Sequence, residues 1–380
     1  ITYAVTPYQM HDVYVRGALA EAFALWLLPL SLYGFTRYAR THQSWGLGLG
    51  ALSLAAVILA HNITALLFFP FLLLWMAGLL AMYGNYVEQA YRSWHKSLGR
   101  MALAAGLGVG LAAFFWLPAL LEQSQVHIEW ILANYNVHDY YNRVWPPIET
   151  SWLFDYRYDP IKLPVRPGLV QIMLATAGSL AIVISSLRSQ DARKYLWLLF
   201  GIPVALLLIY LQRKESTIVW DHLPLIKYLE FPYRVMAVFG VVSALLTGFL
   251  PTLTSSRVGR VVIAGIVGCT VVVVGIARLA PTYTAGLPTD VGGRGIFESE
   301  VARRNLAGAT VSEYSPRWVT ASIDDVLAAV TEPHPHQDPT PPVLSTIDLL
   351  ESGDTTSDML VHARQPFRLV LHRLYMPGWQ

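Results

Sequence analysis

Residues 45–60 read WGLGLGALSLAAVILA, and residues 64–82 read TALLFFPFLLLWMAGLLAM. A helix needs about 20 mostly apolar residues to cross about 30 Å of hydrocarbon, and both runs approach that length. Only a short turn around His61 and Asn62 separates them. Because an open strand cannot satisfy its backbone hydrogen bonds in lipid, helices are favoured. The two runs therefore predict a pair of consecutive membrane-spanning helices.

The composition agrees with this prediction. The chain has 380 residues, of which 54% are hydrophobic and only 14% charged, and its mean hydropathy is +0.43. That leaves too little polar surface to coat a soluble globule of this size. The net charge of +2 offers no basic field for nucleic acid, so we exclude nucleic acid as a partner. Cys269 is the single cysteine, and no Cys/His cluster has metal-ligand spacing, so no metal or other cofactor is indicated.

The same length criterion predicts an α-helical polytopic membrane protein with about eight spans. We place them at residues 17–35, 45–60, 64–82, 101–121, 168–187, 195–211, 233–253 and 261–279.

Positive charges alternate between the connections. Arginine and lysine follow the first, third, fifth and seventh spans, as Arg37, Arg40, Arg92, Lys96, Arg100, Arg188, Arg193, Lys194, Arg257 and Arg260. The positive-inside rule places these connections in the cytoplasm. The opposite side then receives the N-terminal segment, the His61–Asn62 turn, the loops 122–167 and 212–232, and everything after residue 280. We expect the cytoplasmic (inner) membrane of a bacterium, with the C-terminal part extracytoplasmic.

The chain divides into residues 1–280, a transmembrane helical domain, and residues 281–380, which are polar and rich in proline and glycine. We expect the second part to be a small extracytoplasmic β-rich or α+β domain. Ile1 is not an initiator and the chain stops at Gln380 directly after a strand-like run. We therefore interpret the sequence as a fragment, with an element missing upstream and more of the C-terminal domain missing downstream.

Ionisable residues gather at the predicted outer end of the first span: His11, Asp12, Arg16 and Glu21. Asp12 and Arg16 are four residues apart, so they share a helix face and can pair. Glu21 lies about 7.5 Å deeper at the helical rise, where it needs a partner, water or a proton. The simpler interpretation is that Asp12 and Arg16 anchor a helix end.

Two further segments place polar residues on that side. His61 and Asn62 turn the chain between two spans, and Glu230 and Arg234 flank Pro232 at the start of the seventh. Arg234 is suited to hold a phosphate through its planar donors, although an interface anchor would look the same. Asp12, Glu21 and His61 are our candidate catalytic residues. The candidate substrate-binding residues are His11, Arg16, Asn62, Glu230 and Arg234.

The loop 122–167 is rich in tyrosine and tryptophan. An aromatic belt at the membrane interface explains this composition, and stacking against sugar rings is the alternative. Within the loop, His138 with Asp139, and Asp155 with Asp159, are the nearest candidates for acid or base chemistry.

Several short motifs resemble a known family. They are YQMHDVYVRG at residues 8–17, continuing as ALAE, HNIT at 61–64, FPYR at 231–234, SEYSP at 312–316, and PGW at 377–379. The sequence resembles large bacterial multispanning proteins labelled "6-pyruvoyl-tetrahydropterin synthase-related", which look like distant relatives of the GT-C glycosyltransferases and of YfhO-like proteins. Nothing in the residues supports pterin chemistry.

The resemblance implies a membrane-embedded transferase that takes a sugar from a polyprenyl-phosphate carrier on the outer side of the membrane. Such enzymes place an acidic catalytic residue in the first external loop, which we expect upstream of Ile1, so the catalytic acid cannot be assigned to a numbered position. Arg16 and Arg234 would stabilise the departing lipid phosphate, and Glu21 would orient one of these arginines.

Two other functions stay open. The same buried charges suit a lipid or glycan transporter, for which inverted repeats and broken spans in both halves would be the evidence. A non-catalytic scaffold of envelope assembly, with an outer domain that recruits partners, is the third.

Overall fold

The computed structural model describes residues 1–14, 16–83, 94–127, 129, 137–143, 146–149, 165–189, 194–223, 226–276, 292, 295–296, 298–299, 317–318, 336–337, 345–352, 357–363 and 369–370. They fall into two compact units. The first comprises residues 1–121 and 132–283, and the second residues 122–131 and 284–380.

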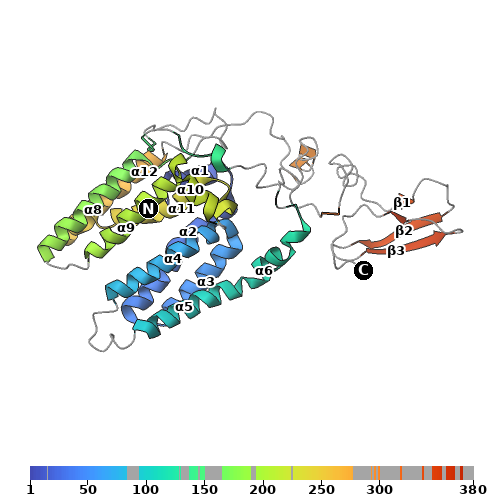
Figure 1. Ribbon diagram of the computed structural model, residues 1–380, viewed down its shortest axis with the longest axis horizontal. Helices are drawn as coiled ribbons and strands as arrows, with labels where there is room; N and C mark the ends of the chain where they lie inside the picture. The colour runs from blue at the N-terminus through green and yellow to red at the C-terminus, as the bar shows by residue number, and fades with distance from the viewer. Residues whose placement is uncertain are drawn as a thin grey trace. The chain divides into compact units, whose positions relative to one another are not determined.

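The first unit is helical (Figure 1). Its α-helices are α1 (Pro7–Tyr14), α2 (Leu19–Thr41), α3 (Trp45–Ala60), α4 (Asn62–Tyr83), α5 (Trp94–Leu111), α6 (Ala113–Glu122), α8 (Leu169–Ser189), α9 (Lys194–Leu211), α10 (Thr217–His222), α11 (Met236–Thr247) and α12 (Arg257–Ile276). Short 3-10 helices are η3 (Val137–Asp139), η4 (Lys214–Ser216), η5 (Ile226–Leu229), η6 (Pro232–Val235) and η7 (Leu250–Leu253).

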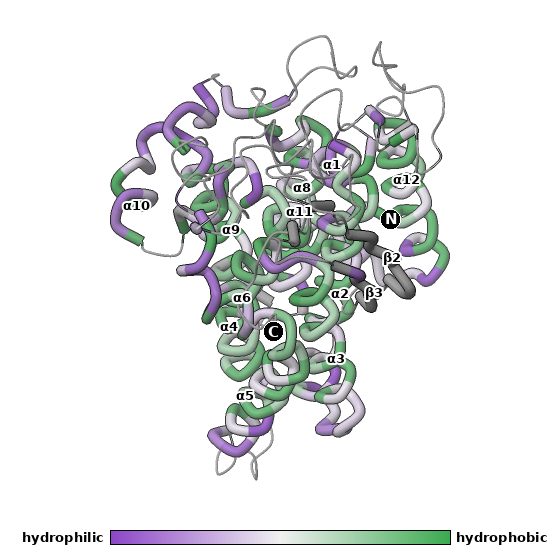
Figure 2. The backbone as a smooth tube through the Cα atoms, turned by 90° about the vertical axis from the view of Figure 1, so that its right-hand side faces the viewer, coloured by the Kyte–Doolittle hydropathy of each residue, from purple (hydrophilic) through white to green (hydrophobic). Residues whose placement is uncertain are grey.

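Each of the eight predicted segments overlaps a described helix, and Figure 2 shows hydrophobic residues along α3, α4 and α5 with hydrophilic residues at the free end of α5. Five helical stretches in the described part are long and apolar enough to cross a membrane: Leu19–Thr41, Asn62–Tyr83, Leu169–Arg188, Pro232–Leu253 and Arg257–Gly275. The bent pair of α5 and α6 makes six if it is one span, and two shorter apolar helices lie at Trp45–Ala60 and Tyr195–Leu211. A membrane protein is thus supported, and the number eight stays a prediction.

The predicted span 101–121 is not one straight helix. The chain bends by 67° between α5 and α6. Gly106, Gly108 and Gly110 weaken the helix before the bend, and the indole N–H of Trp116 donates to the carbonyl of Val109 at 2.9 Å. Inserted side-chain hydrogen bonds of this kind are a common cause of kinks.

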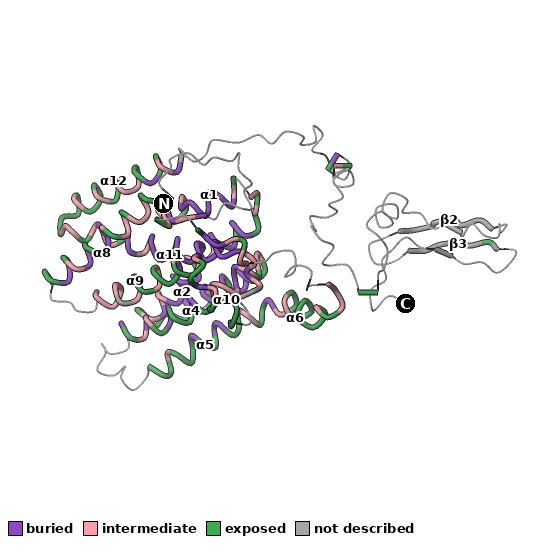
Figure 3. Tube along the Cα trace, turned by 45° about the horizontal axis from the view of Figure 1, so that its top comes forward, coloured by how far each residue is buried: buried purple, intermediate pink, exposed green. Residues whose placement is uncertain are grey.

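The bundle has two groups of helices. In one, α2 packs on α3 and α4, and α3 packs on α5; in the other, α8 and α9 pack on α11. Close approach depends on glycine at two contacts: a Cβ at Gly34 would lie 2.5 Å from the backbone nitrogen of Gly50, and one at Gly178 would lie 2.0 Å from the carbonyl oxygen of Leu246. Helix α1 contacts both α2 and α11, and Figure 3 shows much of it buried.

The second unit contains the 3-10 helix η2 (Gln123–Gln125) and four described strands: β1 (His336–Gln337), β2 (Ser345–Ser352), β3 (Ser357–Ala363) and β4 (Leu369–Val370). Strands β2 and β3 pair antiparallel from Ser345 opposite Ala363 to Ser352 opposite Ser357, with a register shift between Leu349 and Glu351. Strands β1 and β4 also pair antiparallel. A complete β-rich or α+β domain stays a prediction.

Candidate functional site

The connection between α1 and α2 folds back on α1 at a glycine. Gly17 has φ +62°, a left-handed conformation that glycine adopts without strain. The backbone N–H of Arg16 donates to the carbonyl of His11 at 2.9 Å, and that of Ala18 to the carbonyl of Asp12 at 2.8 Å. This turn brings Arg16 beside α1 at the point where α2 begins.

Arg16 contacts two neighbouring acidic residues, Asp12 and Glu21. Its Nη1 lies 2.6 Å from Asp12 Oδ1 and 2.8 Å from Glu21 Oε2. Both carboxylates are buried, and Tyr8 donates its hydroxyl to Glu21 Oε1. The Arg16 guanidinium also lies over the ring of Tyr233, 5.8 Å from its centroid. The predicted pairing of Asp12 with Arg16 is confirmed, although Arg16 lies beyond the end of α1.

Burial changes the acid–base behaviour of two α1 residues. It raises the pKa of Asp12 to about 8, the charge of Glu21 adds to the rise, and Arg16 opposes it. Burial, with Arg16 nearby, lowers the pKa of His11 to about 4, so that its ring is neutral at pH 7. His11 contacts the ring of Tyr233 edge-on. Near neutral pH, therefore, the carboxyl group of Asp12 holds a proton, and Arg16 stays positively charged.

Arg234 is held separately, at the start of the seventh predicted span. Its Nη1 donates to the carbonyl of Leu229 at 3.1 Å, and its Nη2 lies 3.2 Å from Glu230 Oε2. The guanidinium lies over the ring of Phe231, 5.2 Å from its centroid. Glu230 has φ +59°, which is unusual for a residue other than glycine. Arg234 Nε is buried without a hydrogen-bond partner among the described residues.

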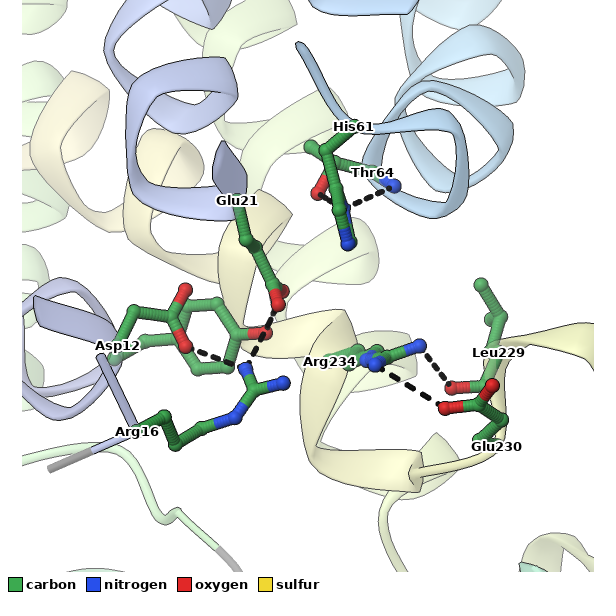
Figure 4. Close-up of polar contacts among 9 residues, drawn as sticks. Asp12, Arg16, Glu21, His61, Thr64, Leu229, Glu230 and Arg234 are labelled. Carbon is green, nitrogen blue, oxygen red and sulfur yellow. Dashed lines mark hydrogen bonds and ion pairs between the residues drawn. The ribbon is translucent and has the colours of Figure 1, made fainter. Parts of the chain in front are cut away.

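His61 faces the space between these two groups. Figure 4 shows its ring pointing from the start of α4 toward the region between Glu21 and Arg234. The backbone N–H of Thr64 lies 3.2 Å from His61 Nδ1, and the Thr64 hydroxyl 2.8 Å from the same atom. A backbone N–H can only donate, so we assign Nδ1 as the acceptor and place the proton of the neutral ring on Nε2.

Burial and the two nearby arginines favour the neutral form of His61. Burial lowers the pKa of His61, and Arg234 and Arg16 lower it further against the opposing effect of Glu21. Neighbouring Asn62, the first residue of α4, is exposed.

We call Asp12, Arg16, Glu21, His61, Glu230 and Arg234 the arginine cluster. The cluster lies where α2, α4 and η6 begin. The basic residues Arg37, Arg40 and Arg188 lie in the last turns of α2 and α8, at the far ends of the helices. Arg188 donates there to the carbonyl of Leu253, just before α12. Arg40 is thus separated from the cluster by the length of α2, and Arg188 by the length of the helical stretch Pro232–Leu253.

Sequence reasoning missed three residues of the site. Tyr8 and Tyr233 contact Glu21 and Arg16, and Thr64 orients His61. The signal for Tyr8 was its position four residues before Asp12, which places both on one face of α1. Tyr233 adjoins Arg234, but nothing in the sequence pairs its ring with Arg16.

Of the four candidates in the loop 122–167, only His138 and Asp139 lie among the described residues. His138 Nε2 lies 3.2 Å from Asp221 Oδ1, and both side chains are more than 40% exposed. His138 thus pairs with Asp221, a residue of α10. Asp155 and Asp159 lie outside the described residues. Among the residues that the structure describes, no group of three or more His, Cys, Asp or Glu side chains could hold a metal ion.

Comparison with known proteins gives no further guide. No family model matches the chain, and no curated protein or solved structure matches it significantly.

Proposed function

We propose that the chain is a membrane-embedded glycosyltransferase of the GT-C type, which takes a sugar from a polyprenyl-phosphate donor. The observation that carries the proposal is the arginine cluster at one end of apolar helices. In this cluster Arg16 is held by two buried carboxyl groups and Arg234 by the half-buried Glu230. Arginine suits phosphate because its planar donors bind two oxygens at once. At the end of a span, the cluster is at the depth of a lipid headgroup.

The reaction requires stabilisation of a leaving phosphate. The acceptor hydroxyl attacks the anomeric carbon and gives its proton to a carboxylate base that is not assigned to a numbered residue. The bond from that carbon to the phosphate oxygen breaks, and the lipid phosphate leaves with the bonding electrons. Fixed positive groups aimed at that oxygen lower the barrier. We assign this role to Arg16 and Arg234, with the Nε2–H of His61 as a third donor.

The carboxylates position the arginines. Asp12 and Glu21 are buried and already bonded to Arg16, and Glu230 is bonded to Arg234. A phosphate that enters must displace carboxylate contacts. Because Asp12 is readily protonated, exchanging its contact with Arg16 for a contact between Arg16 and a ligand costs little free energy. The proposed roles make Asp12, Glu21 and Glu230 positioning residues.

The location of the protein follows from the same proposal. The basic connections would lie in the cytoplasm of a bacterium, and the cluster and the residues after 280 would lie outside the inner membrane.

A lipid or glycan transporter is the second candidate. The observation that favours it is the 67° bend between α5 and α6, because transporters use broken helices at their binding sites. Transporter sites lie near the middle of the bilayer, however, whereas the arginine cluster lies at helix ends.

The transferase proposal is tested with the purified chain in nanodiscs. Labelled polyprenyl-phosphate hexoses and pentoses are supplied with glycan acceptors, and transfer is measured as label gained by the acceptor. We expect transfer by the wild type and loss of about 100-fold in Arg234→Gln, the size expected for removal of one charge-stabilising donor. Arg40→Gln makes the same charge change at the opposite end and should transfer normally. Movement of intact donor across vesicles without transfer would favour the transporter.

A further inference from the structure

Positive charges without matching acids lie at the far end of α2 and the start of α5. Residues 22–121 contain a single acidic residue, Glu88, and five basic ones: Arg37, Arg40, Arg92, Lys96 and Arg100. Lys96 and Arg100 lie in the first two turns of α5, and both are exposed. Figure 2 shows the hydrophilic residues at this end of α5. This part of the chain therefore carries an excess of positive charge that its own residues do not neutralise.

Tyr38 connects the end of α2 to these cations. It is 1% exposed, and its hydroxyl accepts a hydrogen bond from Nη1 of Arg100 at 3.5 Å. His42, the C-cap residue of α2, packs edge-on against the same ring, with 5.8 Å between the ring centroids. A hydrogen bond of 3.5 Å is weak, so the guanidinium keeps its capacity to bind an anion. Arg100 is thus positioned by a buried phenol.

The two cations begin an exposed face of α5. Lys96, Arg100, Leu103 and Leu107 follow one another at spacings of four, three and four residues, which places them on one side of the helix. All four are exposed. Gly108 lies on the side that packs against α3, where its Cβ would be 2.7 Å from the carbonyl oxygen of Ala51. The exposed side of α5 thus presents two cations followed by leucines.

Tryptophan indicates the depth of these cations in a bilayer. Trp94 begins α5 two residues before Lys96, Trp45 begins α3, and both side chains are about half exposed. The Arg37 guanidinium lies 5.7 Å from the centroid of the Trp45 ring. Because tryptophan is enriched where lipid headgroups meet hydrocarbon, Lys96 and Arg100 lie at the depth of the lipid phosphates.

We propose that this face of α5 binds an anionic phospholipid, with the headgroup phosphate on Lys96 and Arg100 and an acyl chain along Leu103 and Leu107. Charge complementarity selects this occupant. A zwitterionic lipid carries its own cation beside the phosphate, whereas an anionic lipid brings net negative charge to basic residues at the membrane surface. The site does not depend on the proposed transferase activity, because Tyr38 follows Glu21 by 17 residues of α2, about 25 Å at the helical rise.

Arg40 provides a matched control at the same end of α2. It follows Tyr38 by two residues, which turns it about 200° around the helix, so it lies on the opposite side of α2 from the Tyr38 contact with Arg100. Arg40 is exposed, like Arg100. Arg40→Gln and Arg100→Gln therefore remove the same charge at the same depth, and only Arg100→Gln changes the proposed site.

The test titrates the detergent-purified chain with phosphatidylglycerol and measures bound lipid by native mass spectrometry. We expect the affinity to fall about fivefold in Arg100→Gln and in Lys96→Gln, the size expected for one cation at an anionic surface, and to change less than about twofold in Arg40→Gln. Lys96→Gln leaves the Tyr38 contact intact, so it tests the site if Arg100→Gln does not fold. Neither phosphatidylcholine nor inorganic phosphate at millimolar concentration should displace the bound lipid.

Three results would overturn the inference. Equal loss of affinity in Arg40→Gln and Arg100→Gln would mean that only total charge attracts the lipid. Equally tight binding of phosphatidylcholine would make the face a surface for ordinary bilayer lipid. Displacement by inorganic phosphate would identify a site for the free ion instead of a phospholipid.

Discussion

Arg16 and Glu21 form an ion pair of 2.8 Å across the turn between α1 and α2, and the same Arg16 nitrogen lies 2.6 Å from Asp12. Glu21 is 2% exposed and Asp12 is fully buried. One cation thus contacts two buried carboxyl groups, which makes Arg16 the residue on which this end of the helical unit depends.

Replacement of Arg16 should destabilise the protein strongly. Arg16→Met leaves Asp12 and Glu21 buried without their cation, and loss of one partner of a buried ion pair typically costs about 3–5 kcal/mol. Glu21→Gln should cost less, because Asp12 still balances Arg16. The measurement is thermal unfolding in detergent. Arg40→Met, at an exposed position, should match the wild type; equal melting of Arg16→Met and Arg40→Met would contradict the expected dependence.

Stability should fall as pH rises above 6.5. The folded state binds a proton on Asp12 up to about pH 8, whereas an unfolded aspartate loses it near 3.8, so folding favours the protonated form and its contribution disappears as pH rises through 8. His11 acts oppositely, since its pKa of about 4 in place of 6.5 costs stability only as pH falls below 6.5. The two effects oppose each other between pH 4 and 6.5, and Asp12 acts alone from 6.5 to 8.

The check is the apparent melting temperature in detergent from pH 6.5 to 9. The wild type should lose stability over that interval, and Asp12→Asn should show a flatter profile whatever its absolute stability. An equally steep fall in Asp12→Asn would exclude Asp12 as the titrating group.

Glycine should be required at Gly178 and dispensable at Gly106. A Cβ at Gly178 would lie 2.0 Å from the carbonyl oxygen of Leu246, so α8 and α11 must separate. We expect Gly178→Ala to cost roughly 3 kcal/mol, the upper end for overpacking. Gly106 also lies within a helix but has nothing within 4 Å of its Cβ position, so Gly106→Ala should raise stability by up to about 1 kcal/mol. Similar melting of the two variants would show that the helices do not approach this closely.

Glu230 should compete with a ligand phosphate for Arg234. Glu230→Gln removes the competing charge and should tighten binding of polyprenyl phosphate about fivefold, or about 1 kcal/mol, the size of a partly exposed ion pair. Equilibrium binding of labelled polyprenyl phosphate measures the change. Glu215→Gln removes a carboxylate that pairs with Arg213 outside the cluster and serves as the control. Weaker binding in Glu230→Gln would mean that Glu230 supports the site instead of blocking it.

Local pattern made much of this arrangement predictable. Apolar runs of about span length predicted segments that overlap helices of the structure, five of which are long and apolar enough to cross a membrane. The spacing of Asp12 and Arg16 indicated a pair that the structure forms. The pairing of Glu230 with Arg234 was not predicted. The bend before α6 was not predictable in the same way, because it involves a single indole hydrogen bond from Trp116.

The assembly of the site depends on tertiary packing. Residues of α1, α4 and η6 lie far apart in sequence, and only the contact of α1 with both α2 and α11 brings Tyr233 over Arg16. The direction of His61 likewise depends on the Thr64 backbone and could not be derived from spacing.

Binding of labelled polyprenyl phosphate to the wild type, Arg234→Gln and Arg40→Gln in nanodiscs tests the central claim most directly. Elution and thermal unfolding must first show that all three proteins are folded. The two variants carry the same net charge. The account predicts saturable binding by the wild type and Arg40→Gln, and binding at least about tenfold weaker in Arg234→Gln, as expected for loss of a charge-assisted contact. Equal affinity in Arg234→Gln and Arg40→Gln would contradict a phosphate site at the arginine cluster.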